Sequence, residues 1–374
     1  MSWAETRVLV LSFTDHGRDP RVHRQIEALR HSCDLTTAGL GPAPGMESRH
    51  VTLLKRSVSL PAKFRRAAEL KLGLVERYYW GTPIARQALQ QLEGRTFDVI
   101  VANDMETLLL ALALAGDTSR VYLDAHEYEP RHMDDRWMFR FFLAPYWDEI
   151  CRRNLPKVHY MTTVCQSLAD EYMKHYDVEC DVLTSAPHYE DLQPSVTKPG
   201  SIRLIHHGGS NRSRRLEMTV EMMDHLDERF SLDMMLLSND RKGMERVEAA
   251  ARERNNVRII DPVPMPEIAR FIQQYDVAVS MIWPKSFNYR YSLPNKLFEA
   301  IQGRLALAVW PSPEMKCFVE TCENGVVAKD FTSRSMAETI SELNAERIQQ
   351  FKAASARAAE THNAEVNSDK LTVY

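Results

Sequence analysis

A segment rich in glycine and arginine near the middle of the chain has the residue types that bind phosphate. It reads His206-His207-Gly208-Gly209-Ser210-Asn211-Arg212-Ser213-Arg214-Arg215-Leu216-Glu217 and follows an apolar, strand-like run. Glycines let a ligand approach the backbone, N–H groups at the start of a helix attract anions, and arginines add positive charge. The segment predicts a pyrophosphate-binding turn that opens a helix. A solvated turn between a strand and a helix is the alternative.

A second segment places a lysine and a carboxylate on one short helix. It reads Ser292-Leu293-Pro294-Asn295-Lys296-Leu297-Phe298-Glu299-Ala300-Ile301-Gln302-Gly303. Pro294 suits the first turn of a helix, and Leu297, Phe298 and Ile301 give the helix an apolar face. Glu299 follows Asn295 by one turn, close to that face. A carboxylate in such a place can accept both hydroxyls of a ribose, or it can be a surface residue.

The elements that must position these segments alternate regularly along the chain. Apolar, strand-like runs are separated by longer amphipathic stretches, which predicts parallel sheets covered by helices on both faces. The first half contains such runs at 8–13, 98–102, 121–124, 159–164 and 181–184; the second half contains them at 202–206, 232–238, 257–260, 277–282, 306–310 and 325–328.

The same alternation predicts two doubly wound α/β domains. Pro187, Pro194 and Pro199 punctuate a polar stretch between the halves. We expect an N-terminal domain at 1–186, a linker at 187–200, a C-terminal domain at 201–358, and a last helix at 359–374 that packs back on the first domain. Ligands of such folds bind beyond the carboxyl ends of the strands, so a cleft between two facing halves is the expected site.

The composition excludes several classes of protein. The chain has 374 residues, 44% of them hydrophobic, and a net charge of −4, which argues against nucleic-acid binding by bulk charge. No apolar run approaches the ~18 residues of a membrane span. Six cysteines without a Cys-x-x-Cys pair favour a reduced, cytoplasmic setting. A Walker-type phosphate loop and an Asp-x-Asp pair are both absent, which argues against a P-loop nucleotidase and against a metal-held donor.

The succession of motifs resembles family 4 of the retaining glycosyltransferases. The segment 293–303, followed by Pro313-Glu314-Met315 and Gly325-Val326-Val327, is similar to the donor-binding signature of that family. In the first half, family segments are resembled in the expected order by Asp19-Pro20-Arg21-Val22-x-Arg24, Asn103-Asp104-x3-Leu108, Asp124-Ala125-His126-Glu127, 162–170 and Ser185-Ala186-Pro187. Asp276 in the second half does so too. The resemblance implies the GT-B fold of two facing Rossmann-like domains, and sugar transfer from a nucleoside-diphosphate donor with retention and without a metal or other cofactor.

The resemblance also implies roles for single residues. Glu299 would hold the donor ribose, Arg214 the pyrophosphate, and His126 would face the transferred sugar. The remaining donor-side residues would be Gly208, Gly209, Arg212, Pro264, Leu293, Asn295 and Lys296. Two positions depart from the pattern, because Tyr291 replaces the first glutamate of the motif and Gly209 replaces a second basic residue. Lys296 or Arg212 is expected to supply the missing charge.

The acceptor side is expected in the first domain. Asp15, His16, Asp19, Arg21 and Asp104 follow predicted strands there. The stretch 55–77 interleaves lysines and arginines with Leu60, Phe64 and other apolar residues, which suits either a solvated helix face or contact with anionic lipid. The expected protein is therefore a cytoplasmic enzyme, peripheral at the inner face of the membrane, that glycosylates a glycan or lipid-linked acceptor for polysaccharide or glycolipid synthesis. An epimerase or hydrolase on the same fold, or a silent partner of another transferase, would share these features.

Overall fold

The computed structural model describes residues 5–47, 49–238 and 240–372. Contacts divide the chain into two compact units. The first runs as far as Leu183 and also takes in Ser286–Asn288; the second comprises Thr184–Lys285 and Tyr289–Leu371. Across the described residues, no helix has both the length and the apolar composition that a membrane crossing requires. Each unit is an α/β domain built on one parallel sheet.

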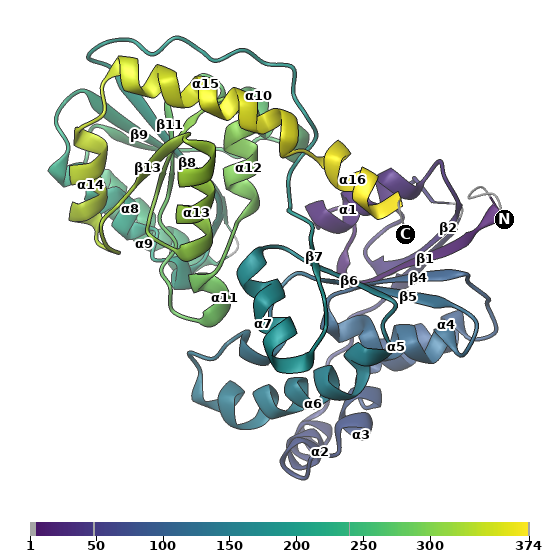
Figure 1. Cartoon of the computed structure of the whole chain (residues 1–374). Coiled ribbons are helices and arrows are strands. Elements are labelled where there is room, and N and C mark those ends of the chain that lie inside the picture. The colour runs from purple at the N-terminus through teal and green to yellow at the C-terminus, as the bar shows by residue number, and fades with distance from the viewer. Residues whose placement is uncertain (1–4, 48, 239, 373–374) are drawn as a thin grey trace. The chain divides into compact units, whose positions relative to one another are not determined.

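The described residues of the first unit form a seven-stranded sheet with the order β3-β2-β1-β4-β5-β6-β7 (Figure 1). All its strand pairs are parallel, because a helical segment returns the chain before most strands. The strands are β1 (Arg7–Asp15), β2 (Asp34–Leu40), β3 (Arg49–Leu53), β4 (Val99–Asn103), β5 (Arg120–Ala125), β6 (Tyr160–Thr163) and β7 (Asp181–Val182). The helices are α1 (Pro20–Leu29), α2 (Leu60–Lys71), α3 (Val75–Trp80), α4 (Pro83–Leu92), α5 (Met105–Ala115), the short turns η2 (Glu129–Arg131), η3 (Phe139–Leu143) and η4 (Leu155–Lys157), α6 (Ala144–Asn154) and α7 (Gln166–Tyr176).

Two strands of this sheet have no counterpart among the predicted ones. The β2 sequence is Asp-Leu-Thr-Thr-Ala-Gly-Leu, in which the polar Thr36 and Thr37 interrupt the apolar run. Both threonines are buried in the sheet. Their β-branched side chains favour a strand, and that preference was the available signal for β2.

The described part of the second unit contains a six-stranded sheet with the order β10-β9-β8-β11-β12-β13. Its strands are β8 (Ile202–Ser210), β9 (Phe230–Ser238), β10 (Val257–Ile260), β11 (Val277–Ser280), β12 (Ala306–Val309) and β13 (Gly325–Val327). Its helical elements are η5 (Arg212–Arg214), α8 (Glu217–Glu221), η6 (Met222–His225), α9 (Arg241–Arg252), η7 (Met265–Glu267), α10 (Ile268–Ile272), α12 (Asn295–Gln302), α13 (Pro313–Cys322), α14 (Ser333–Ser341), α15 (Ala345–Thr361) and α16 (Ala364–Thr372). The short helix α11 (Phe287–Arg290) begins in the first unit and ends in the second.

Alternate residues of the second sheet enter two different hydrophobic clusters. In β12, Ala306 and Ala308 belong to one cluster, whereas Leu307 and Val309 belong to the other. Side chains that alternate along a strand point to opposite faces, so both faces of this sheet are buried. Helix α15 packs against α12, as Figure 1 shows. Covering both faces leaves only the ends of the strands available for a ligand.

The stretch predicted as a linker is anchored on the second unit. The buried Arg304 guanidinium donates to the carbonyl oxygens of Glu190 and Leu192. Farther along, the hydroxyl of Thr197 and the ammonium of Lys352 both donate to Asp276 Oδ1, each at 2.8 Å. These buried bonds fix 190–197 against the C-terminal sheet. The placement of the last helix on the first domain stays a prediction, and its residues 373–374 lie outside the described part of the chain.

In each sheet, the order in which successive strands are added reverses next to the strand that comes first in the sequence. The strands that follow β1 extend first to one side through β2 and then to the other through β4. The strand β8 stands in the same way between β9 and β11. In open parallel sheets, the crevice for a ligand lies at the carboxyl ends of the strands where the order reverses. The topology therefore singles out the ends of β1 and β4 in one unit and of β8 and β11 in the other.

Candidate active site

Two cations converge at the end of β8 in the second unit. A Cβ atom placed on Gly208 would lie 3.6 Å from Arg214 Nη1 and 3.9 Å from Lys296 Nζ. The backbone of Gly208 has a φ of +125°, a conformation that side chains with a Cβ rarely adopt. Among the described residues, neither cation forms an ion pair with a carboxylate. Arg214 donates only weakly to the Gly209 carbonyl, at 3.4 Å. Two cations without a counter-ion at a backbone lacking side chains make a suitable place for an anion.

Lys296 is buried among groups that disfavour its charge. Its Nζ lies 3.4 Å from Nε2 of His206, whose Nδ1 donates to the Val279 carbonyl at 2.9 Å. Nε2 is therefore the acceptor of this pair. Burial and the nearby Arg214 together lower the pKa of Lys296 to about 7, and Glu299 partly opposes the shift. Burial and the nearby Lys296 also hold the pKa of His206 well below its usual value. An incoming anion would stabilise the charged form of Lys296.

Glu299 is held by a neighbouring strand. Its Oε2 accepts a hydrogen bond from His207 Nε2 at 2.8 Å, and the two side chains are only 13% and 4% exposed. The second carboxylate oxygen, Oε1, remains for a ligand. His207 was not among the predicted site residues, although it belongs to the segment rich in glycine and arginine. A polar side chain at the end of an otherwise apolar strand was the signal for it.

The predicted turn around Gly208 and Gly209 is wrong. Both glycines belong to β8, where they pair with Leu236 and Leu237 of β9. The strand continues to Ser210 because β9 offers partners over its whole length. Arg214 then ends the 3₁₀ turn η5, and the five-residue helix α8 begins only at Glu217. The candidate anion-binding groups of this segment are thus the cations rather than a helix N-terminus.

The other predicted donor-side residues lie in several surroundings. Arg212 Nε donates to Asp240 Oδ2 at 2.7 Å, so its charge is already paired at the N-terminus of α9. Asn295 begins α12, and Leu293 packs against a hydrophobic cluster of the second unit. Pro264 is exposed before η7. Of the two residues expected to supply the missing charge, Lys296 accompanies Arg214 and Arg212 is engaged elsewhere.

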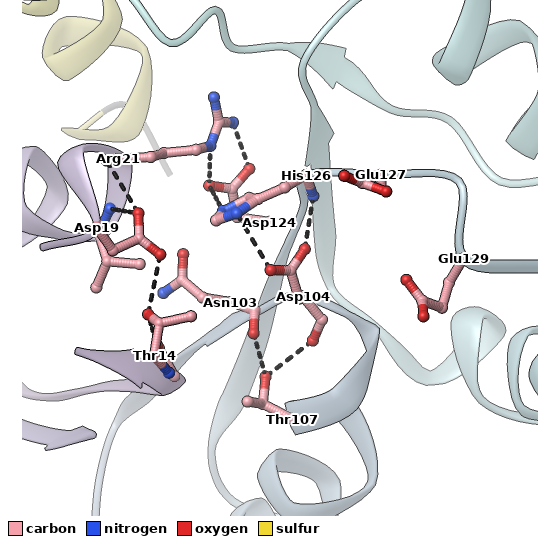
Figure 2. A network of polar contacts seen from close by, with 12 residues as sticks. Thr14, Asp19, Arg21, Asn103, Asp104, Thr107, Asp124, His126, Glu127 and Glu129 are labelled. Atoms are coloured by element: carbon pink, nitrogen blue, oxygen red, sulfur yellow. Dashed lines mark hydrogen bonds and ion pairs between the residues drawn. The ribbon is translucent and has the colours of Figure 1, made fainter. Parts of the chain in front are cut away.

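In the first unit, His126 lies between two aspartates (Figure 2). Its Nδ1 is 3.2 Å from Asp104 Oδ2 and its Nε2 is 3.3 Å from Asp124 Oδ2. Burial alone would lower the pKa of His126, but the two carboxylates raise it to about 10. The ring is therefore an imidazolium at neutral pH. Because both nitrogens face carboxylates, His126 is suited to positioning and not to exchanging protons with a substrate.

The same aspartates tie the ends of several strands together. Asp124, at the end of β5, accepts from Arg21 Nε at 2.6 Å and from Arg21 Nη2 at 2.5 Å. Asp104 follows β4 with a φ of +64°, and its Oδ1 accepts from the backbone N–H of His126 at 3.0 Å. A non-glycine residue in that region costs about 1–3 kcal/mol, so the surrounding bonds must hold it. Figure 2 shows Asp19, which caps α1, beside this network.

Two further predicted acceptor-side residues, Asp15 and His16, lie where β1 ends. The Asp15 carboxylate accepts from the Gly17 N–H at 3.0 Å and shapes the turn. His16 is fully buried, and a Cβ on Gly39 would lie only 2.1 Å from its Nε2. Burial lowers the pKa of His16 to about 4. This surrounding favours a packing role for His16, whereas Arg21 and Asp104 belong to the network of His126.

No known protein-family profile and no curated sequence matches this chain. Solved structures do resemble it. The α,α-trehalose-phosphate synthase (UDP-forming) from Burkholderia vietnamiensis gives a TM-score of 0.68 at 11% identity, over 99% of this chain and 97% of that one. HepE from Anabaena, solved with UDP and glucose, gives 0.70 at 10% identity over 98% of both chains. The fold is GT-B. TarM from S. aureus, solved with fondaparinux, alpha-GlcNAc-glycerol and UDP, gives 0.63 at 13% identity over 78% of this chain, which spans only 58% of the length of TarM.

The likeness extends to both sheets of the molecule. The first two structures cover nearly the whole chain, so both Rossmann-like domains of a GT-B protein have counterparts here. The GT-B fold predicted from the sequence is therefore confirmed. At identities near 10% the likeness establishes the fold, and the chemistry has to be argued from the residues at the strand ends.

Proposed function

We propose that this chain is a glycosyltransferase that moves a sugar from a nucleoside diphosphate to an acceptor hydroxyl. The observation that carries the proposal is the pair Arg214 and Lys296, which lacks a carboxylate partner in the described structure and stands at the reversal point of the second sheet. Beside the pair, Glu299 is held by His207 with one carboxylate oxygen left for a ligand. Two cations for a diphosphate and one carboxylate for a ribose are the groups that a nucleotide-sugar donor requires.

The chemistry follows from where charge develops. When the bond between the sugar and the diphosphate breaks, the diphosphate gains negative charge and the sugar acquires oxocarbenium character. Fixed positive groups at the diphosphate lower that barrier. Arg214 and Lys296 would supply this stabilisation. The acceptor would attack from the face of the leaving group, with a phosphate oxygen taking its proton, so that configuration is retained and no metal is needed. Retention and transfer of a hexose rest on the family 4 resemblance.

His126 takes a positioning role in this scheme. Its ring is bracketed by Asp104 and Asp124, and these carboxylates in turn order the ends of β4 and β5. The cationic ring would keep the strand ends in place while the sugar is bound, rather than transfer a proton. Asp19 and Arg21 would support the same region, because Arg21 fixes Asp124.

The acceptor is proposed to be a glycan or a lipid-linked molecule, met at the inner face of a membrane. The support is the stretch 55–77, in which exposed apolar side chains, such as Phe64 at 76% exposure, are interleaved with exposed lysines and arginines. Each engaged basic residue would add about 1 kcal/mol of attraction to anionic lipid. The protein should therefore sediment with vesicles of 30% phosphatidylserine at low salt but not with purely neutral vesicles. Equal sedimentation with both would contradict membrane contact.

The decisive experiment measures nucleotide binding and turnover together. A thermal-shift screen against nucleoside diphosphates should single out UDP, the nucleotide present in the HepE and TarM structures. Ligand at 100 times its Kd would stabilise the fold by ~2.7 kcal/mol. UDP release from a UDP-sugar that requires an acceptor would support transfer. Release without an acceptor would indicate a hydrolase, conversion of the sugar without release an epimerase, and binding without turnover a silent partner.

A further inference from the structure

A cavity of about 430 Å³ lies in the first unit, and its lining does not include the residues that His126 contacts. Its lining includes Phe13 near the end of β1, Leu40 at the end of β2, and Glu106 in the first turn of α5, directly after β4. The cavity therefore lies at the carboxyl ends of β1 and β4, where the strand order of this sheet reverses. That is the place where open parallel sheets bind ligands. The residues expected to form the acceptor side from the sequence do not line it.

The lining of the cavity has an apolar and a polar part. Tyr78, Tyr146 and Trp147 form an aromatic wall, in which the Tyr78 and Tyr146 rings meet edge to face with centroids 4.7 Å apart. Phe139 and Leu143, both from η3, extend this wall. A ligand that places alkyl groups or ring faces against this wall removes them from water, which makes its binding more favourable.

The charged side chains of the lining are Glu106, Glu129, His132, Lys55 and Arg66. Burial and the neighbouring Glu129 raise the pKa of Glu106. His132 Nδ1 lies 3.1 Å from Glu129 Oε2, and burial lowers the His132 pKa less than its carboxylate neighbours raise it, to about 9. The carboxyl groups can accept hydrogen bonds from sugar hydroxyls, and the cationic side chains can donate hydrogen bonds to them. Because Glu106 follows Asp104 by two residues, this polar part is close to the His126 network.

We propose that this cavity binds the acceptor, and that the acceptor is an amphiphilic glycoside whose alkyl chain lies along the aromatic wall while its sugar hydroxyls meet Glu106 and Glu129. The inference rests on the proposed transferase function and adds the chemical class of the acceptor. An amphiphilic acceptor would also explain why the same elements expose apolar side chains on their outer surface. Helix α2 and η3, which contribute Arg66 and Leu143 to the cavity, expose Phe64 and Phe141 to solvent at 76% and 71%. An acceptor held in a lipid layer would meet this apolar surface first.

The test is a chain-length series with a defined probe. Hexyl, heptyl and octyl β-D-glucoside are titrated into the full-length protein below their micelle concentrations, and Kd is measured by calorimetry. Each added methylene that enters the cavity should lower Kd about fourfold. Free glucose should bind too weakly to detect. A Kd that does not change with chain length would overturn the proposal, because the site would then recognise the sugar alone.

A matched pair of variants locates the binding. Met133 lines the cavity and is 37% exposed, so Met133→Trp should fit the fold while filling the space. Met133→Trp should raise the Kd for octyl glucoside at least tenfold. Phe141→Trp, on the outer surface of η3, should leave the Kd unchanged. An unaltered Kd in Met133→Trp, with a native melting curve, would refute the assignment; if that variant fails to fold, the chain-length series still decides.

UDP binding is measured in the same samples and separates the two proposals. UDP binding without any chain-length dependence would reject the amphiphilic acceptor and leave the transferase standing. Chain-length dependence without UDP binding would reject the transferase, and the cavity would then be a site for an amphiphilic glycoside that is not an acceptor.

Discussion

Replacing Arg214 with alanine should damage turnover far more than folding. The folded chain depends little on this side chain, because its hydrogen bond to the Gly209 carbonyl is long, at 3.4 Å, and the residue is partly exposed. Loss of such a bond costs at most about 1 kcal/mol of stability. In the reaction the same guanidinium faces the charge that grows on the leaving diphosphate. Removing one preorganised charge partner typically lowers kcat by a factor on the order of 10²–10³.

The position of Lys296 refines that magnitude. Lys296 is the second cation at Gly208, but its pKa near 7 leaves it only partly charged before the donor binds. Arg214 is therefore the permanently charged member of the pair, and the decrease in kcat on its removal should lie toward the upper part of that range. Since the charge develops as the bond breaks, kcat should fall more than the affinity for UDP. Arg214→Lys should recover only part of the rate, because an ammonium lacks the planar fork that grips two phosphate oxygens.

The assay compares initial rates of acceptor-dependent UDP release with melting curves of the same samples. Arg212→Ala is the matched control, because Arg212 lies in the same turn η5 but pairs with Asp240. Its kcat should stay within about threefold of the wild type. The reasoning fails if Arg214→Ala also keeps kcat within about threefold, or if it loses activity only through unfolding. Lys296 would then be the principal cation.

Three other predictions follow from groups on both sheets. Glu299→Ala should weaken UDP binding by roughly 1.5–3 kcal/mol, and it should also lower the melting temperature because the buried His207 loses its acceptor; an unchanged Kd would remove Glu299 from the site. Because the pKa of Lys296 is about 7 and a bound diphosphate should raise it, UDP binding should take up a proton above pH 7. The Kd for UDP should therefore be nearly constant below pH 7 and rise by up to about tenfold per pH unit above it, whereas Lys296→Met should bind UDP weakly at every pH without that rise. The folded-state pKa of His126, about 10, exceeds its unfolded value of about 6.5, so the stability that its charge contributes is complete below pH 6.5 and is lost as pH rises through 10. In urea unfolding between pH 6.5 and 9, the free energy of unfolding of the wild type should fall by up to about 1.4 kcal/mol per pH unit relative to that of His126→Gln, and a parallel pH dependence of the two proteins would contradict the paired imidazolium.

The sequence by itself determined the alternation of strands and helices and hence the two parallel-sheet domains. That inference succeeded because strands buried on both faces are continuous apolar runs, such as Val277–Ser280, and need no knowledge of their neighbours. Where burial depends on neighbours, the pattern was insufficient. The strand β2 carries two threonines that only the sheet buries, and β8 extends through Gly208 and Gly209 only because β9 pairs with them.

The site was determined in part by local sequence and in part by the tertiary structure. Arg214, Lys296 and Glu299 were predicted as donor-side residues from their segments. Only the folded chain brought Arg214 and Lys296 to one glycine, paired Glu299 with His207, and turned Arg212 toward Asp240. The aromatic cavity of the first unit had no sequence signal, since its residues come from nine elements and three loops of that unit. Periodicity reports burial, which is local, whereas distances between side chains on different elements depend on sheet order and helix packing, and these exist only once the whole domain has folded.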